Sequence, residues 1–131
     1  MFKAIIFDLI GVLISVSPEE ERENRKLVEK LKENYKLAIL SNASLREVRE
    51  IGKMSEYFDA VVLSSETGFG KPKKEAYEIT LSKIGATPKE TIFIDDTHEN
   101  IEGAKKAEIE AVLYRGTKQL KKDLKERGIR L

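Results

Sequence analysis

Cysteine is absent from this chain of 131 residues, which excludes disulfide bonds and thiolate metal sites. An excess of charge of one sign is also lacking, since 24 lysines and arginines face 23 aspartates and glutamates, for a net charge of +1. A chain so nearly neutral has no long-range attraction for nucleic acid or for an anionic membrane. We therefore expect neither nucleic acid nor a membrane as a partner. The absence of cysteine fits a reducing compartment, and we expect the protein to be cytoplasmic.

Long hydrophobic runs are lacking too, because no stretch approaches the ~20 apolar residues that a membrane-spanning helix requires. The opening run, residues 1–14, is interrupted by Asp8 and is followed by no small-residue cleavage site. It therefore predicts a strand rather than a signal peptide. Repeats, low-complexity segments and linkers are absent, and we expect residues 1–131 to form a single domain.

Five short apolar runs rich in β-branched residues predict buried strands. They cover residues 3–7, 36–40, 60–63, 91–94 and 110–114. Charged stretches with apolar residues at helical spacing separate these runs, and a last amphipathic helix is expected over residues 117–127. Strands that are apolar on both faces and alternate with helices favour an α/β fold, a parallel sheet covered by helices on both sides.

Two helix ends are marked by their residues. Ser17 is a candidate cap for a helix with Pro18 in its first turn, and Gly85 is expected to close the helix that carries Tyr77 and Leu81. Both helices lie between predicted strands, so they support the alternation of strand and helix along the chain.

Polar residues gather just after the predicted strands, where ligands bind in an open parallel sheet. They are Asp8, Ser41, Asn42, Asp95 and Asp96, and the third strand leads through residues 64–66 toward Lys71. Three carboxylates at neighbouring strand ends repel one another unless they are protonated or bridged by a cation, and Mg²⁺ prefers such oxygen ligands. A hydroxyl and a lysine nearby would stabilise phosphoryl oxygens, and one carboxylate would be free to act as a nucleophile.

Four segments, in this order, resemble the four motifs of the haloacid dehalogenase (HAD) superfamily. They are Phe7-Asp8-Leu9-Ile10-Gly11-Val12-Leu13, Leu40-Ser41-Asn42-Ala43, Gly70-Lys71-Pro72, and Phe93-Ile94-Asp95-Asp96 with Asn100-Ile101-Glu102-Gly103-Ala104. The resemblance extends from about Lys3 to Tyr114. It implies a Rossmann-like, HAD-type domain whose five parallel strands lie in the order 5-4-1-2-3, and a Mg²⁺-dependent hydrolase, here a phosphatase of unknown phosphorylated substrate.

The resemblance also implies which residues would hold the Mg²⁺ ion. Asp8 would be both the nucleophile and a metal ligand, and the backbone carbonyl of Ile10 would be a second ligand. Asp96 would be the main remaining protein ligand, with Asp95 assisting directly or through water. Asn100 would support the metal-binding loop.

The phosphoryl group is assigned to the second and third motifs in the same way. Ser41 and Asn42 would hold it by hydroxyl and backbone contacts, while Lys71 would neutralise its charge and orient Asp8. His98, the only histidine, is assigned no role because magnesium prefers oxygen donors.

Two departures from the phosphatase pattern bear on activity. The position two after the nucleophile is an aspartate that transfers protons in phosphatases, and here it is Ile10. Losing a general acid–base typically lowers the rate by ~10² to 10⁴, less where the leaving group is already good. Only residues 9–40 separate Asp8 from Ser41, which leaves no room for a cap domain. The site would be open to water unless a second subunit covers it.

Other interpretations remain open at this stage. The domain could keep the metal and phosphate cradle and serve as a binding or scaffold protein, an alternative that Ile10 supports. It could also be a core from which a cap was removed. Taken singly, Asp8 could form a turn, Ser41 and Asn42 could cap a helix, and Lys71 could be one solvated lysine among many.

Overall fold

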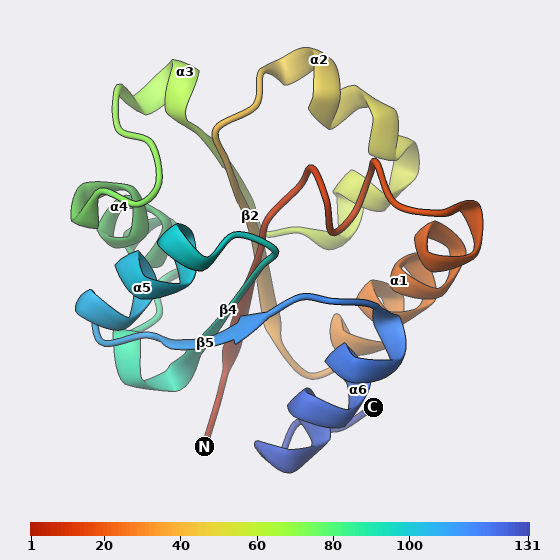
Figure 1. The fold of residues 1–131 in the computed structure, drawn as a ribbon. Helices are drawn as coiled ribbons and strands as arrows, with labels where there is room; N and C mark the ends of the chain where they lie inside the picture. The colour runs from red at the N-terminus through yellow and green to blue at the C-terminus, as the bar shows by residue number, and fades with distance from the viewer.

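The computed structural model describes residues 1–131 and contains one five-stranded parallel sheet in the order β3-β2-β1-β4-β5 (Figure 1). The strands are β1 (Ala4–Phe7), β2 (Lys36–Ser41), β3 (Ala60–Leu63), β4 (Thr91–Asp95) and β5 (Glu110–Leu113). Each strand begins and ends within one residue of the run that predicted it, and the expected strand order is confirmed. The middle strand, β1, pairs with β2 on one side and β4 on the other.

Helices occupy every connection between strands and follow the last strand. They are α1 (Pro18–Leu31), α2 (Leu45–Val48) with the 3₁₀ helix η1 (Arg49–Tyr57), α3 (Ser64–Thr67), α4 (Lys74–Ile84), the 3₁₀ helix η2 (Pro88–Glu90), α5 (His98–Lys106) and α6 (Thr117–Glu126). The predicted helix ends are confirmed, because the Ser17 hydroxyl accepts the backbone N–H of Glu20 at 3.1 Å. Gly85 closes α4 in the left-handed region, with φ of 65°.

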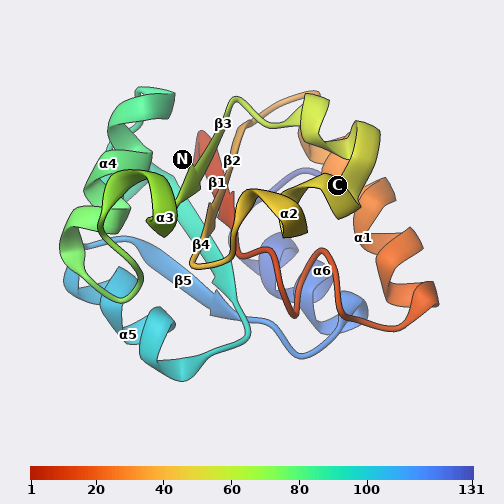
Figure 2. The ribbon, with the colours of Figure 1, turned by 90° about the horizontal axis from the view of Figure 1, so that it is seen from above.

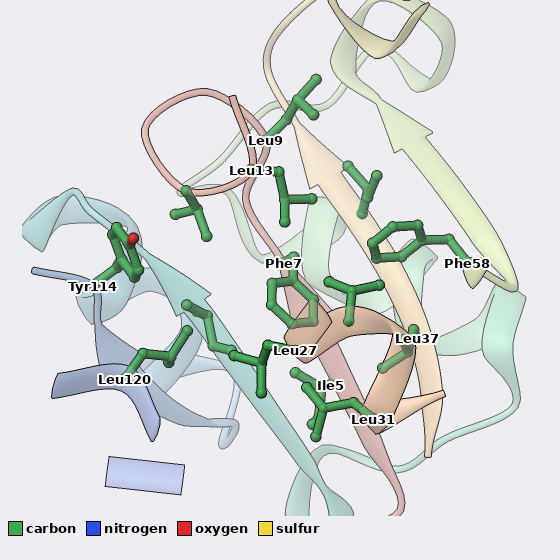
Figure 3. Close-up of a cluster of buried hydrophobic side chains, with 14 of the residues drawn as sticks. Ile5, Phe7, Leu9, Leu13, Leu27, Leu31, Leu37, Phe58, Tyr114 and Leu120 are labelled. Atoms are coloured by element: carbon green, nitrogen blue, oxygen red, sulfur yellow. The ribbon is translucent and has the colours of Figure 1, made fainter. Parts of the chain in front are cut away.

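Alternate residues of each strand pack on opposite faces of the sheet. From β1, Ile5 and Phe7 join a core beneath α1, η1 and α6, whereas Ala4 and Ile6 join a second core beneath α4 and α5. The view from above shows these two helical layers, and a close-up shows part of the first core (Figures 2 and 3). Fully burying a large aliphatic or aromatic side chain contributes roughly 1.5–3 kcal/mol, so both faces of the sheet hold the fold together.

The connections at the carboxyl edge of the sheet are short. A loop and α1 alone join β1 to β2, so no cap domain is inserted there, as the sequence predicts. The connection from β2 to β3 is one α-helical turn followed by η1, which is interrupted at Gly52, where φ is 56° and ψ is −131°. None of the helices is both long enough and apolar enough to cross a membrane.

Candidate active site

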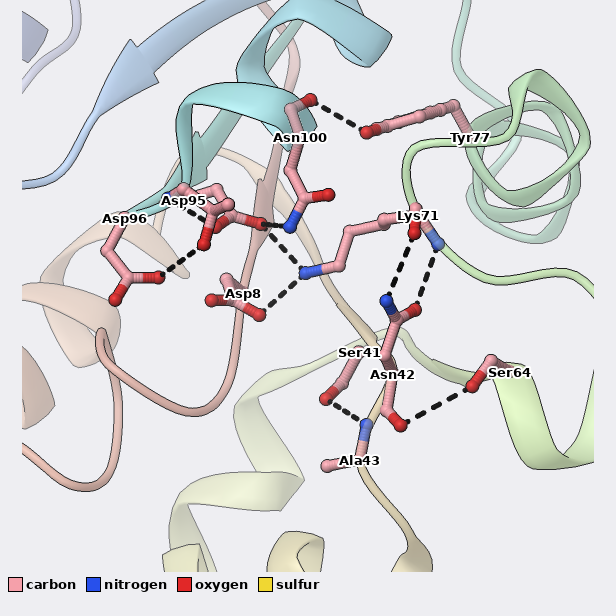
Figure 4. A network of polar contacts seen from close by, with 11 residues as sticks. Asp8, Ser41, Asn42, Ala43, Ser64, Lys71, Tyr77, Asp95, Asp96 and Asn100 are labelled. Carbon is pink, nitrogen blue, oxygen red and sulfur yellow. Dashed lines mark hydrogen bonds and ion pairs between the residues drawn. The ribbon is translucent and has the colours of Figure 1, made fainter.

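The predicted site residues meet at the carboxyl edge of the three central strands (Figure 4). Asp8 directly follows β1, Ser41 is the last residue of β2, and Asp95 is the last residue of β4. Because β1 lies between β2 and β4, the ends of these strands are adjacent, and the loop before α4 brings Lys71 into the same place. The structure therefore gathers these side chains from four separate segments of the chain.

Lys71 is the centre of the polar network. Its ammonium group donates to Asp8 Oδ1 at 2.6 Å and to Asp95 Oδ2 at 2.8 Å. The Lys71 side chain is only 2% exposed, and its Nζ lies 5.5 Å from the centre of the Phe93 ring. Burying a charge is costly unless opposite charges pair with it, as the two carboxylates do here, and the ring face adds a weaker attraction. The sequence predicted the contact with Asp8 but not the one with Asp95.

Asp8 is held in an environment that opposes its ionisation. Burial raises the pKa of Asp8 to about 7, the Lys71 ammonium opposes that rise, and the Asp95 carboxylate adds to it. A divalent cation beside Asp8 would favour the charged form, as a nearby positive charge does for any carboxylate. Asp8 can therefore serve as a nucleophile at neutral pH when such an ion is present.

Asp95 and Asp96 are neighbours in sequence with opposite environments. Asp95 is completely buried, and its carboxylate accepts from the Asn100 side-chain amide at 3.1 Å and from the Thr97 backbone N–H at 3.0 Å. Asp96 is exposed, and one of its carboxylate oxygens lies within 4.8 Å of a carboxylate oxygen of Asp8 and of Asp95. The loop after β1 approaches Asp96 so closely that a Cβ on Gly11 would lie 2.2 Å from Asp96 Oδ2.

The donor set suits a hard cation. Asp8, Asp95 and Asp96 each offer a carboxylate oxygen, and these oxygens all lie within 4.8 Å of one another. Mg²⁺ is bound through one or two carboxylates together with waters and phosphate oxygens, so the residues present fit that ion. Asp95 accepts from Lys71, Asn100 and the Thr97 N–H, whereas Asp8 accepts from Lys71 through one oxygen, so Asp8 and Asp96 have more free carboxylate oxygen with which to ligate an ion.

Asn42 makes a contact that sequence reasoning missed. Its side-chain amide donates to the Lys71 backbone carbonyl at 3.1 Å, and its Oδ1 accepts the Lys71 backbone N–H at 2.9 Å. The amide thus pairs with the main chain of the lysine as a strand would. The neighbouring Ser41 is buried, and its hydroxyl accepts the Ala43 N–H at 2.9 Å. No pattern in the sequence links Asn42 to Lys71, because they lie far apart along the chain.

A small pocket of about 230 Å³ opens over these residues. It is lined by Asp8, Ile10, Ser41, Asn42, Ala43, Lys71 and Asn100. Ile10 is 43% exposed and lines this pocket. Its side chain has no polar group, so the position that is an aspartate in phosphatases offers no acid here. His98 is exposed at the start of α5 and does not line the pocket. A larger groove of about 750 Å³ lies between the first turns of α1 and α6. None of the residues that line it is hydrophobic, and none is Asp8, Asp95 or Asp96.

Comparison with known sequences points to one family. Residues 22–108 match the family described as haloacid dehalogenase-like hydrolase. Among curated proteins, a pyrophosphatase from Bacillus cereus is 30% identical over 79 residues, covering 58% of this chain and 37% of that protein. A phosphorylated carbohydrates phosphatase from Thermotoga maritima is 28% identical over 109 residues, covering 70% of this chain and 50% of its own length. The chain thus spans half or less of the length of these two relatives.

Solved structures share the fold over nearly their whole length. An uncharacterized protein from Corynebacterium glutamicum has a TM-score of 0.81 and 25% identity, with 100% of this chain and 98% of that one covered. A HAD family enzyme from Bacteroides thetaiotaomicron, solved in complex with magnesium and inorganic phosphate, has a TM-score of 0.72 and 21% identity. That comparison covers 88% of this chain and 95% of the other, and it establishes the likeness of fold alone.

Proposed function

The chain belongs to the haloacid dehalogenase-like hydrolases, and we propose that it is a Mg²⁺-dependent phosphatase that forms an aspartyl-phosphate on Asp8. The observation that carries the proposal is the placement of Asp8 beside Lys71 and two further aspartates, next to an open pocket. The names of the two curated relatives support a phosphoryl substrate. At about 230 Å³, the pocket is smaller than the ~300–1,000 Å³ typical of pockets for drug-sized ligands, and it suits a phosphoryl group.

In this proposal Asp8, the Ile10 carbonyl and Asp96 hold the Mg²⁺ ion, with Asp95 supporting them. The bound ion supplies positive charge that offsets the charge on the phosphoryl oxygens. Ser41 and the backbone at Asn42 bind those oxygens. The predicted roles are compatible with the geometry, because the Ile10 carbonyl accepts no hydrogen bond within the protein.

The reaction runs in two displacements at phosphorus. A carboxylate oxygen of Asp8 attacks the phosphoryl group, the bond to the leaving oxygen breaks, and the leaving group departs with the bonding electron pair. Water then attacks the phosphorus of the aspartyl-phosphate, the bond between phosphorus and the Asp8 oxygen breaks, and the protons of the water remain on the inorganic phosphate or pass to solvent, which restores the Asp8 carboxylate. Lys71 fixes the orientation of Asp8 in both steps and offsets negative charge on the phosphoryl group.

Leaving-group protonation sets the preferred substrates. The ionisable side chains that line the pocket are Asp8 and Lys71, which are already paired with each other. Neither is free to protonate the leaving oxygen, and Ile10 has no proton to give. We therefore propose that aryl phosphates, acyl phosphates and phosphoanhydrides react faster than alkyl phosphates, because their leaving groups depart without a proton.

Hydrolysis of a colourless aryl phosphate that releases a coloured phenolate tests this function. We expect turnover to require Mg²⁺ and to fall about 10³-fold or more in Asp8→Asn, since the amide is a poor nucleophile. Asp59→Asn is the matched control. Asp59 directly precedes β3, so it lies at the amino ends of the parallel strands, whereas the site lies at their carboxyl ends. Absence of turnover in the wild type, or turnover that survives in Asp8→Asn, would refute the proposal.

The missing acid is tested by Ile10→Asp. We expect this variant to hydrolyse alkyl phosphates about 10²-fold to 10⁴-fold faster than the wild type, with a smaller gain on aryl phosphates. Ile10→Asn is the control, because it has nearly the same size as aspartate but cannot transfer a proton. An equal gain in both variants would show that polarity at position 10, and not acid catalysis, limits the rate.

A second function is favoured by the exposed Ile10 in the pocket. The protein would then bind Mg²⁺ and a phosphoryl group without hydrolysing it, as a binding or scaffold protein. Calorimetry that shows Mg²⁺-dependent binding of inorganic phosphate, together with undetectable hydrolysis, would favour this function. Detection of a phosphoryl group on Asp8 by mass spectrometry would count against it.

A further inference from the structure

Asn24 is a buried polar residue of α1 that does not line the pocket. Its side-chain amide donates to the Val12 carbonyl at 2.8 Å and to the Tyr114 hydroxyl at 2.9 Å, while its Oδ1 accepts the Thr117 hydroxyl at 2.7 Å. Asn24 is only 1% exposed, and its bonds to Val12 and Tyr114 are buried. The residue ties the loop of residues 9–14 to the end of β5 and to the first turn of α6.

The loop of residues 9–14 is tightly folded at its base. The Leu9 carbonyl accepts the backbone N–H groups of Leu13 and Ile14 at 2.8 and 3.0 Å. These bonds close the loop upon itself, and the side chains of Leu9, Val12 and Leu13 are buried in the core. The bond from Asn24 to the Val12 carbonyl adds a directional contact, a hydrogen bond from a different element to the backbone of the loop.

This loop carries a backbone group of the proposed metal site. The Ile10 carbonyl accepts no hydrogen bond, and the next residue, Gly11, has φ of 92° and lies against the carboxylate of Asp96. A displacement of the loop would therefore move the Ile10 carbonyl and disturb Asp96 together. The two other carboxylates of the site lie at strand ends, where the sheet holds their backbone, whereas the loop backbone has no strand partner and is held by side-chain packing and by Asn24.

We propose that Asn24 is a positioning residue for the metal site: through Val12 it holds the loop so that the Ile10 carbonyl can join Asp8 and Asp96 around the ion. The inference rests on the proposed function. Asn24 touches neither the pocket nor the carboxylates, and it acts through the backbone alone. Outer partners of this kind typically change metal affinity by about 10-fold to 100-fold when they are removed.

The test compares Asn24→Leu with Tyr114→Phe. Asn24→Leu keeps the side-chain size but removes the bond to Val12, whereas Tyr114→Phe removes a neighbouring bond of the same network and leaves the bond to Val12 in place. Titration calorimetry with Mg²⁺ alone is expected to give a Kd raised about 10-fold to 100-fold in Asn24→Leu and within about 2-fold of wild type in Tyr114→Phe. Asn24→Ser, which is too short to reach Val12, is the second variant if the leucine prevents folding.

Amide hydrogen exchange of the metal-free proteins gives a readout that does not depend on the ion. Exchange of the amides in the loop is expected to speed up in Asn24→Leu more than in Tyr114→Phe, even where both variants unfold at a similar temperature. Wild-type Mg²⁺ affinity in Asn24→Leu, or an equal loss of affinity in Tyr114→Phe, would overturn the positioning role. Failure of the wild type to bind Mg²⁺ at all would instead overturn the proposed function, and this inference with it.

Discussion

Lys71→Met should remove much of the stability of the fold at neutral and higher pH. The methionine keeps the apolar stem that packs near Phe93 but removes the only cation between two buried carboxylates, whose side chains are 10% exposed for Asp8 and 0% for Asp95. Breaking a buried ion pair by removing one partner costs about 3–5 kcal/mol, because the remaining charge is left without compensation. Domains are typically stable by about 5–15 kcal/mol, so this loss is a large share of the total.

Urea unfolding followed by circular dichroism would measure the effect. Lys74→Met is the control, because Lys74 is exposed on α4 and pairs at 3.9 Å with Glu78, a contact worth about 0.3–0.5 kcal/mol. The difference between Lys71→Met and wild type is expected to shrink from pH 8 to pH 5, because protonation neutralises a carboxylate that has lost its cation. A loss within about 1 kcal/mol of that in Lys74→Met at pH 8 would refute the electrostatic reasoning.

Two more predictions concern the proposed metal site. Because burial raises the pKa of Asp8 to about 7, proton and Mg²⁺ compete for that carboxylate, and the calorimetric Kd for Mg²⁺ should rise about tenfold per pH unit below 7. A Kd that stays constant from pH 8 to pH 5 would contradict it. Gly11→Ala should weaken Mg²⁺ binding more than Gly52→Ala: both glycines have positive φ, but only the Cβ at position 11 would strike Asp96. Equal affinities in the two variants would contradict the close approach.

The strands were predictable because each has to be apolar on two faces. Residues such as Ile5 and Ile6 point to opposite cores, so an uninterrupted apolar run marks the strand without any periodic pattern. Helix ends were predictable where a local bond defines them, as at Ser17, whose hydroxyl caps α1. The broken helix after β2 was not predicted in this way. Gly52 adopts the φ of 56° and ψ of −131° that glycine tolerates, but a single glycine among charged residues is also compatible with a regular helix.

The gathering of the site was predictable for a topological reason. In a parallel sheet all carboxyl ends lie on one edge, so residues that follow adjacent strands meet there whatever their separation in sequence. The difference in burial between Asp95 and Asp96 is visible only in the structure. One is buried under Lys71 and Asn100 and the other is exposed, a contrast that two identical neighbouring residues cannot reveal.

The role of Asn42 illustrates what sequence motifs leave out. Its position beside Ser41 predicts contact with the phosphoryl group, yet both ends of its side chain are already paired with the backbone of Lys71. Even a Cβ on Gly70 would come within 2.9 Å of Asn42 Oδ1, so the side chain has little freedom to turn toward a substrate. If Asn42 binds phosphoryl oxygens, it must therefore do so through its backbone, while its side chain holds the backbone of Lys71, the residue that pairs with Asp8.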